Sequence, residues 1–382
     1  MKRRTFLGAG LALAASGPAW GRTRTFDVVV VGAGAIGATI AYDLRREGLS
    51  VALVDRGPAG REASWASAGM IQPYGPKDAP SWSARAAHVS KERYDDLEPR
   101  LFEETGRRIG YGGEGGLVLA VDDDEAGSLQ RREGFLDRKA VREREPGLPE
   151  SVVAALLLPE HRFLDARAYT AVVVEAARRR GVKIRENLPV QALLRDGGRV
   201  IGVRAGEEEI AAGTVVVAAG AWSGGIDPGL KLPVRPVHGQ IQSLAGPKGG
   251  LRHNLQRLSA GGYATPRADG RVLVGATTED FGFEKKVTPD GLSALAGVTR
   301  ALLPHLADHK PLDTWSGLRP GSPDGLPAVG PDPRASGLVW ATGHGGYGMM
   351  QGPATAAVVT DLVLMRKPRI PVASVDPARF VR

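Results

Sequence analysis

The chain has 382 residues, a length that exceeds one ordinary hydrophobic core and favours two domains. Its composition, 42% hydrophobic and 24% charged, is typical of a soluble globular protein, and no 18-residue apolar run indicates a transmembrane helix in the mature chain. The absence of cysteine excludes disulfides, thiolate metal sites and cysteine nucleophiles, and the net charge of +8 is interspersed with acids, which argues against nucleic acid binding.

The first 21 residues predict an export signal. Paired arginines in Lys2–Arg4 precede a short apolar segment, Leu7–Ala15, and small residues follow at Ala19–Gly21. A basic start, an apolar stretch and a small-residue cleavage site are typical of secretory signals, and paired arginines are typical of the twin-arginine type. We therefore expect a periplasmic or secreted protein. The twin-arginine route carries folded proteins, which suits a chain that binds its cofactor before export.

Residues 26–56 predict a strand, a glycine turn, a helix and a second strand. The apolar run Val28–Val31 leads into the turn Gly32-Ala33-Gly34-Ala35-Ile36-Gly37, and the second apolar run ends in Asp55. In this setting the Gly-x-Gly-x-x-Gly turn is the fingerprint of a dinucleotide-binding unit, whose glycines permit a tight turn, close approach of a pyrophosphate and close packing of the helix. The carboxylate of Asp55 is placed to bind a ribose. The unit alone does not distinguish FAD from NAD.

Small residues dominate the next segment, 62–72. Ser64 and Ser67 are candidates for phosphate contacts, and Gly69 with Met70 for a close approach to a ring. The segment is equally compatible with a plain helix start that happens to be rich in small residues.

The middle of the chain alternates helical and strand patterns. We expect helices over Ser81–Phe102, Arg138–Pro149, Asp165–Arg180 and Pro289–Leu303, and strands over Leu117–Val121, Val182–Arg185, Val190–Leu194, Val200–Ala205, Thr214–Ala219, Tyr263–Pro266 and Val272–Ala276. Asp122–Glu125 predicts a helix N-terminus, because it lacks the glycine and spaced ligands of a calcium loop. No metal site is expected. The valine-rich strand that ends before Gly220 predicts a return to the first sheet, so the nucleotide domain is expected to be discontinuous.

The C-terminal third contains a segment dense in glycine and proline. We interpret Leu232–Leu244 as a crossing between domains and Asp313–Gly330, which contains Arg319, as a rigid loop without regular structure. A strand at Leu338–Thr342, a glycine-rich turn and a helix over Pro353–Leu364 follow.

Taken together, these pieces resemble the D-amino-acid oxidase-like flavoprotein family, and within it the glycine oxidase branch. The matching segments follow one another along almost the whole mature chain: Val31–Gly37, Ser64–Met70, Glu114–Leu119, Val216–Ser223, Tyr263 with Pro266 and Arg267, Arg271–Ala276, Gly317–Gly321, Asp324–Gly325, Ala341–His344 and Asp376–Phe380.

The resemblance implies that the nucleotide is FAD. The residues that it places beside FAD are Gly32, Gly34, Ala35, Ile36, Gly37, Asp55, Arg56, Ala63, Ser64, Ala68, Gly69, Met70, Val190, Gly220, His344, Gly345, Gly346, Tyr347, Gly348, Met349 and Met350. It also implies that Arg319 pairs with the substrate carboxylate and that Tyr263 lies in the substrate pocket, which makes these two the catalytic candidates. Tyr347 is a third candidate for substrate contact.

One segment departs from the pattern of the family. Some glycine oxidases carry a second arginine after the Gly-His pair, where this chain has Gly345-Gly346-Tyr347. The absence of a side chain at Gly346 is expected to open the pocket, and Tyr347 to close another side of it. The identity of the preferred amino acid therefore stays open.

The chemistry of the residues is consistent with this resemblance. An arginine binds a carboxylate in a bidentate manner better than a lysine does. No catalytic base is strictly needed, because a neutral amine can deliver hydride from its α-carbon to a flavin and leave an imine that water hydrolyses. His344 is interpreted as a residue that hydrogen-bonds within its loop.

We therefore predict an α/β fold with a discontinuous, Rossmann-like FAD-binding domain and a smaller α+β substrate domain with a mixed or antiparallel sheet. The predicted ranges are 1–21 for the signal, 22–95, 155–235 and 311–382 for the FAD-binding domain, and 96–154 and 236–310 for the substrate domain.

The expected reaction is oxidative deamination of glycine, sarcosine or a small D-amino acid, with oxygen as the acceptor and hydrogen peroxide as a product. Three alternatives stay open: a dehydrogenase that reduces a quinone, an NAD enzyme, and a flavin-binding subunit that needs a partner or has no catalysis of its own. The sequence also leaves a homo-oligomer open.

Overall fold

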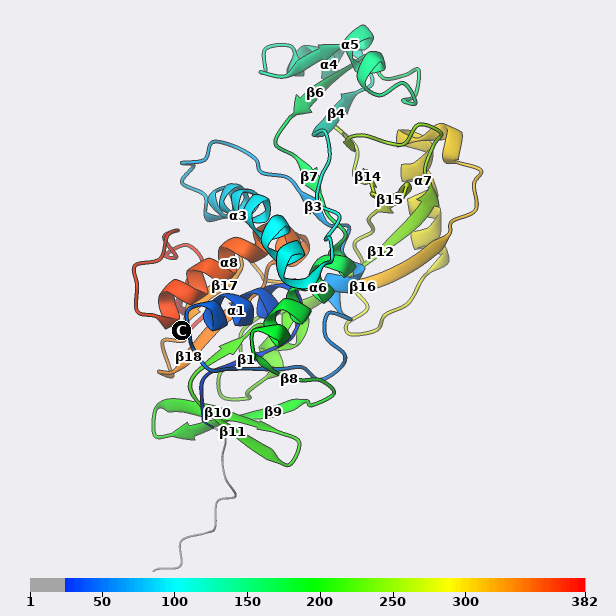
Figure 1. Cartoon of the computed structure of the whole chain (residues 1–382). Helices are drawn as coiled ribbons and strands as arrows, with labels where there is room; N and C mark the ends of the chain where they lie inside the picture. The colour runs from blue at the N-terminus through cyan, green and yellow to red at the C-terminus, as the bar shows by residue number, and fades with distance from the viewer. Residues whose placement is uncertain (1–24, 382) are drawn as a thin grey trace, which may run out of the picture.

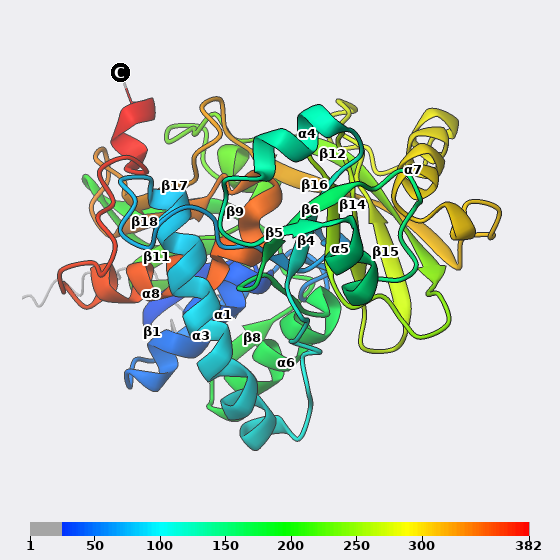
Figure 2. The same cartoon turned by 90° about the horizontal axis from the view of Figure 1, so that it is seen from above.

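The computed structural model of the protein describes residues 25–381, so the predicted export signal lies outside the described residues. Within this range the chain builds two large sheets, which Figures 1 and 2 show as neighbouring layers of one α/β molecule. No helix between residues 25 and 381 is both long and apolar enough to cross a membrane. The predicted fold class is confirmed.

The first sheet contains the dinucleotide fingerprint. Its strands run in the order β17-β18-β11-β1-β2-β8, with β9 and β10 attached to β11, and their bounds are β1 (Thr25–Val31), β2 (Val51–Val54), β8 (Lys183–Arg185), β9 (Val190–Asp196), β10 (Arg199–Ala205), β11 (Glu208–Val217), β17 (Ala328–Pro331) and β18 (Leu338–Thr342). β1 pairs in parallel with both β2 and β11. The predicted return of the valine-rich strand to the first sheet is therefore confirmed.

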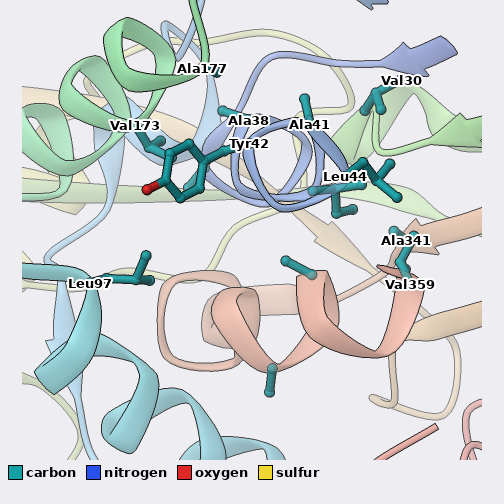
Figure 3. Packing of buried hydrophobic residues seen from close by; sticks show 14 of the residues in the cluster. Val30, Ala38, Ala41, Tyr42, Leu44, Leu97, Val173, Ala177, Ala341 and Val359 are labelled. Atoms are coloured by element: carbon teal, nitrogen blue, oxygen red, sulfur yellow. The ribbon is translucent and has the colours of Figure 1, made fainter. Parts of the chain in front are cut away.

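Four helices cover one face of this sheet: α1 (Ala35–Arg46), α3 (Trp82–Thr105), α6 (Ala166–Arg179) and α8 (Gly348–Val363). Side chains alternate along β1, so that Val28 and Val30 pack under these helices, while Val29 and Val31 belong to the core on the opposite face. Figure 3 shows α1 between α6 and α8, with Tyr42 directed toward Val173. This packing fixes the start of α1 at the edge of the sheet.

The second sheet is mostly antiparallel and runs in the order β16-β12-β15-β14-β13-β4-β6-β5. Its strands are β4 (Gly116–Ala120), β5 (Phe135–Asp137), β6 (Ala154–Leu158), β12 (Arg235–Ala245), β13 (Asn254–Arg257), β14 (Tyr263–Pro266), β15 (Arg271–Gly275) and β16 (Asp313–Gly321). The helix α7 (Pro289–Leu302) packs on it, and α4 (Asp123–Leu129) and α5 (Arg138–Arg144) lie beside β5 and β6. The predicted helix N-terminus at Asp122 is confirmed, because its carboxylate caps α4.

Several shorter elements complete the chain. They are α2 (Ala63–Ala66), the paired strands β3 (Met70–Ile71) and β7 (Arg162–Phe163), and the 3-10 turns η1 (Gly220–Gly225), η2 (Pro304–Leu306), η3 (Gly345–Tyr347) and η4 (Pro377–Phe380).

The structure corrects the interpretation of residues 313–330 as a loop. β16 is a regular strand of nine residues that pairs with β12 along its whole length. β16 is the edge strand of the second sheet, so no further strand pairs with its outer side. A proline such as Pro320, which has no N–H to donate, is therefore tolerated in this strand. Two strands that the sequence analysis assigned to the FAD-binding ranges, β6 and β16, belong to the second sheet.

The helix expected over 353–364 begins five residues earlier, at Gly348, and Pro353 lies inside it. Proline lacks the N–H that would bond the carbonyl four residues before it, that of Met349. The hydroxyl of Tyr94 donates to that carbonyl at 2.7 Å and replaces the missing bond. α8 can therefore continue through Pro353. α5, in contrast, is shorter than the predicted helix over Arg138–Pro149, because it ends at Arg144, before Pro146.

Candidate active site

A single large cavity, of about 1130 Å³, extends from the glycine turn after β1 to the strands β12 and β16 of the second sheet. Every residue that the sequence analysis placed beside the cofactor or substrate lines this cavity, except Gly37. The residues come from both sheets and from the segments 60–72 and 341–350. The structure thus brings together groups that are widely separated in the sequence.

The turn after β1 is shaped by two glycines. Gly32 has a φ of +104°, and a Cβ there would lie 2.4 Å from the carbonyl oxygen of Ala218. A Cβ on Gly37 would lie 1.9 Å from the carbonyl oxygen of Gly32. The prediction that Gly37 contacts the cofactor is corrected, because this residue faces the turn and permits close packing of α1 on β1.

The carboxylate of Asp55 holds the same turn. It accepts hydrogen bonds from the backbone N–H groups of Ala33 at 2.6 Å and Gly57 at 2.9 Å. Burial raises the pKa of Asp55, although these two N–H groups oppose the shift. Asp55 lines the cavity, and its carboxylate has further lone pairs with which it could accept hydrogen bonds from a ribose.

The segment 62–70 forms the wall opposite the turn. The hydroxyl of Ser64 accepts from the N–H of Ala35 at 2.9 Å, and that of Ser67 accepts from the N–H of Gly69 at 3.2 Å. The buried guanidinium of Arg267 donates to the carbonyl of Ala68. Both predicted serines therefore face the cavity and also fix the backbone around it.

Arg56 and Trp222 form the outer wall on the nucleotide side. The Arg56 guanidinium lies 3.8 Å from the centre of the Trp222 ring and 3.1 Å from the carboxylate of Glu62. Phe283 also packs on the indole, with ring centres 5.3 Å apart. Trp222 lies within the matching segment Val216–Ser223 but was not among the predicted site residues.

Arg319 lies on β16 and faces the cavity from the second sheet. Its Nη1 donates to the carbonyl of Thr277 at 2.9 Å and approaches that of His238 at 3.4 Å. A Cβ on Gly239 would lie 2.4 Å from Arg319 Nη1, so the guanidinium rests directly against the backbone of β12. No carboxylate forms an ion pair with Arg319 among residues 25–381.

Tyr263 and Tyr347 line the cavity near this guanidinium. Burial raises the pKa of Tyr263 to about 12, and the neighbouring Arg319 and Arg267 oppose the shift. Tyr263 is therefore a neutral hydrogen-bond donor at physiological pH. The Tyr347 side chain is 56% exposed toward the cavity and solvent. A Cβ on Gly346 would lie 3.7 Å from Arg319, an ordinary contact distance, so this turn leaves open space beside the guanidinium.

His344 is buried where β18 meets α8. Its Nε2 lies 2.9 Å from the hydroxyl of Thr355, and its Nδ1 has no hydrogen-bond partner within the described part of the chain. Burial lowers the pKa of His344 to about 3, so the imidazole is neutral at physiological pH. The His344 side chain therefore bonds a residue of α8 and not the backbone of its own loop, which differs from the prediction, and the neutral imidazole has no role as a cationic acid.

Other residues of the wall were missed from the sequence. Gln72 donates to Gln256 at 3.2 Å, and Thr278 and Phe283 enter the wall from the connection between β15 and α7. No local pattern distinguishes these residues, because they meet only through the pairing of distant strands. Gly239 lies in the predicted crossing Leu232–Leu244, and its role beside Arg319 follows only from the pairing of β12 with β16.

Comparisons with known proteins point to one family. The family model for FAD-dependent oxidoreductases of the DAO type matches residues 27–362. Glycine oxidase from Pseudomonas aeruginosa is 38% identical over 363 residues, covering 92% of this chain and 98% of that protein. The hydrogen cyanide synthase subunit HcnC from the same organism is 31% identical, covering 94% and 97%. The crystal structure of glycine oxidase from Geobacillus kaustophilus is similar with a TM-score of 0.86 at 30% identity, covering 94% of this chain and all of that one.

Proposed function

The chain belongs to the DAO family of FAD-dependent oxidoreductases, and we propose that it oxidises the CH–NH bond of glycine, sarcosine or a small D-amino acid. The proposed acceptor is oxygen, with hydrogen peroxide as a product. The observation that carries this proposal is the half-buried guanidinium of Arg319, which faces the cavity and has no carboxylate partner among the described residues.

The cofactor is FAD, and the cavity fits it at the phosphate end. Gly34, Ala35 and Ile36 line the cavity where α1 begins, and the first turn of this helix contains no acidic residue. The first N–H groups of a helix have no carbonyl partner within the helix, and they attract phosphates together with the helix dipole. A side chain at Gly34 would contact Ser64 Oγ at 3.1 Å and narrow this passage.

The residues of the second sheet would bind and orient the substrate. Arg319 presents its remaining N–H groups to a carboxylate, and two strands hold its position. Tyr263 supplies a neutral hydroxyl beside it. FAD, when bound, would supply the hydride acceptor, and the oxidised substrate would be an imine that water hydrolyses to an oxo acid and ammonia, or to an oxo acid and methylamine in the case of sarcosine. The site therefore acts mainly through orientation, and the amine reacts in its neutral form.

The proposal is tested by anaerobic titration of the purified FAD protein. Glycine, sarcosine, D-alanine, D-proline and L-alanine are added in turn while the flavin absorbance is recorded. We expect at least one of the first four to bleach the flavin, and air to restore the colour. Restoration only by a quinone would replace oxidase with dehydrogenase. If the flavin is bound but no amine bleaches it, the hypothesis of a flavin-binding subunit that needs a partner replaces the proposal. The similarity to HcnC, a subunit of an enzyme, supports that hypothesis.

Arg319→Met sharpens the test. Loss of a bidentate, charge-assisted contact is expected to raise the KM for the amine about a hundredfold, while the FAD content stays that of the wild type. FAD content is expected to be unchanged because the donor bonds of Arg319 within the described chain go only to the carbonyls of Thr277 and His238. An unchanged KM would remove the basis of the proposal.

We also propose that the protein is exported, on the strength of Lys2–Arg4 and the apolar segment after it. Mass determination of the mature N-terminus after cell fractionation tests this proposal. Arg3→Lys together with Arg4→Lys is expected to retain the precursor inside the cell with its leader attached.

A further inference from the structure

A polar network lies directly behind Arg319. Residues 276–288, here called the 276–288 connection, link β15 to α7 and cross over β12. The backbone groups of Glu279 and His238 exchange two hydrogen bonds of 3.0 Å, which fasten the connection to the strand. From this connection only Thr278 and Phe283 reach the cavity, so the carboxylate of Glu279 lies outside the cavity wall.

The Glu279 carboxylate receives hydrogen bonds from four side chains. The donors and distances are Gln240 Nε2 at 2.8 and 3.0 Å, Thr277 Oγ1 at 2.8 Å, His238 Nδ1 at 2.9 Å and Thr288 Oγ1 at 3.2 Å. Burial raises the pKa of Glu279, but these donors outweigh burial and hold it below its usual value. The carboxylate is therefore ionised, and it joins both ends of the connection to β12.

His238 joins this carboxylate to the far end of the connection. Its Nδ1 lies 2.9 Å from the Glu279 carboxylate, and its Nε2 lies 2.9 Å from the carbonyl oxygen of Lys286. The imidazole is fully buried, and it ties the connection to β12 at residues 279 and 286.

Arg319 is bound by the same residues. Thr277 uses its hydroxyl to donate to Glu279, and its carbonyl oxygen accepts from Arg319 Nη1 at 2.9 Å. The second carbonyl near Nη1, at 3.4 Å, belongs to His238. Both carbonyls that locate the guanidinium therefore come from residues whose side chains bind the Glu279 carboxylate.

We propose that Glu279 is a positioning residue, which acts through Thr277 and His238 to hold the Arg319 guanidinium at the angle that a substrate carboxylate requires. This inference rests on the proposed carboxylate-binding role of Arg319. A displacement of about 1 Å in a binding group is enough to cost up to about a hundredfold in rate. In Glu279→Gln an NH₂ group replaces one carboxylate oxygen. This group is a hydrogen-bond donor that faces the existing donors, so we expect Thr277 to shift.

The test measures carboxylate binding without turnover. Glycolate, in which a hydroxyl replaces the amine of glycine, is titrated into the FAD-loaded protein, and its dissociation constant is taken from the change in flavin absorbance. Glu279→Gln is expected to weaken glycolate at least about tenfold, with bound FAD unchanged. Glu284→Gln is the matched control in the same connection. Its side chain is 61% exposed, and among the described residues its carboxylate pairs with Lys286 alone, so we expect a change within about twofold.

A double-mutant cycle separates positioning from general structural loss. In an Arg319→Lys background, Glu279→Gln is expected to add less than about a twofold loss, because the group that it positions is gone. An equal loss in both backgrounds would overturn the positioning role. Wild-type affinity for glycolate in Glu279→Gln, together with weak glycolate binding in Arg319→Lys, would also overturn the positioning role. The proposed function would then remain intact. A wild-type protein that binds no glycolate and is bleached by no amine would instead overturn the proposed function.

If Glu279→Gln does not fold, Thr277→Val tests the same link. It removes the hydroxyl that joins Glu279 to the carbonyl beside Arg319 and keeps that carbonyl. A several-fold weakening of glycolate supports the proposal, and unchanged affinity contradicts it.

Discussion

The two ends of the cavity are built by different means. At the nucleotide end, the turn around Gly32 is shaped by backbone packing and by Asp55, whose bonds to Ala33 and Gly57 span at most 22 residues of sequence. At the substrate end, Arg319 is held by carbonyls 42 and 81 residues away, and the side chains of the residues that carry these carbonyls bind the Glu279 carboxylate. The first end depends mainly on close backbone packing, and the second on a network of side-chain hydrogen bonds.

This difference predicts how each end responds to change. Where backbone packs directly against backbone, no flexible side chain can move aside. One added methyl group therefore destabilises the fold by the full cost of the steric overlap. A side-chain network can lose one member and keep the fold, but the geometry of the group that it holds changes. Substitutions at the nucleotide end should therefore affect FAD retention, and those at the substrate end should affect affinity for the substrate.

The largest effect is expected from Gly37→Ala. Its Cβ would lie 1.9 Å from the carbonyl oxygen of Gly32, so α1 must shift away from β1 and the turn must open. We expect loss of bound FAD and a destabilisation of roughly 3 kcal/mol, measured as the flavin-to-protein absorbance ratio and the Tm. The matched control is Gly57→Ala, whose Cβ would have no heavy atom within 4 Å. Retention of FAD by Gly37→Ala would show that backbone packing does not shape this end.

The same contrast explains what the sequence could predict. The strand, turn and helix of residues 26–56 were recognised because all the determinants lie within one short segment. The strand character of residues 313–321 was missed, because its glycines and prolines are unfavourable locally and only pairing with β12 at a sheet edge makes them acceptable. The start of α8 was missed for a similar reason, since the hydroxyl of Tyr94 replaces a bond more than 250 residues away.

The candidate site divides in the same way. Arg319 and Tyr263 could be proposed as site residues because the sequence resembles a known family. The contacts that give Arg319 a defined position could not be predicted in this way. Glu279 lies in a polar connection that has no recognisable pattern, and its role depends on side chains from β12 and α7. Networks of this kind follow from tertiary packing, which a single sequence does not reveal.

An intermediate effect is expected from acid, at a different pH for His344 and for Glu279. His344 is neutral when folded, with a pKa lowered by burial to about 3 from an ordinary 6.5. The unfolded chain takes up this proton first, so stability is lost as the pH falls below about 6.5, at up to about 1.4 kcal/mol per pH unit. Glu279 has its pKa lowered from 4.5, so its contribution is present above pH 4.5 and is lost below it. The contribution of His344 should therefore be lost at a higher pH than that of Glu279.

Urea unfolding between pH 7 and pH 3.5 measures this order. His344→Gln should flatten the decline that begins near pH 6.5, and Glu279→Gln should change only the part below pH 4.5. The decline does not vanish in His344→Gln, because burial also lowers the pKa of His161 to about 4. Identical pH profiles for His344→Gln and the wild type would contradict the neutral, buried state of this imidazole.

The smallest effect is expected from Gly346→Ala, at the point where the two ends meet. The new Cβ would lie 3.7 Å from Arg319, an ordinary contact, so FAD content and the KM for glycine should change less than about threefold. The KM for D-alanine and D-proline should rise more, because the methyl group occupies space beside the guanidinium. Gly345→Ala is the control for backbone strain, because its φ of +53° makes any side chain strained at about 1 kcal/mol and its Cβ would have no heavy atom within 4 Å. If Gly346→Ala weakens all substrates equally, the open space beside Arg319 does not receive the substrate side chain.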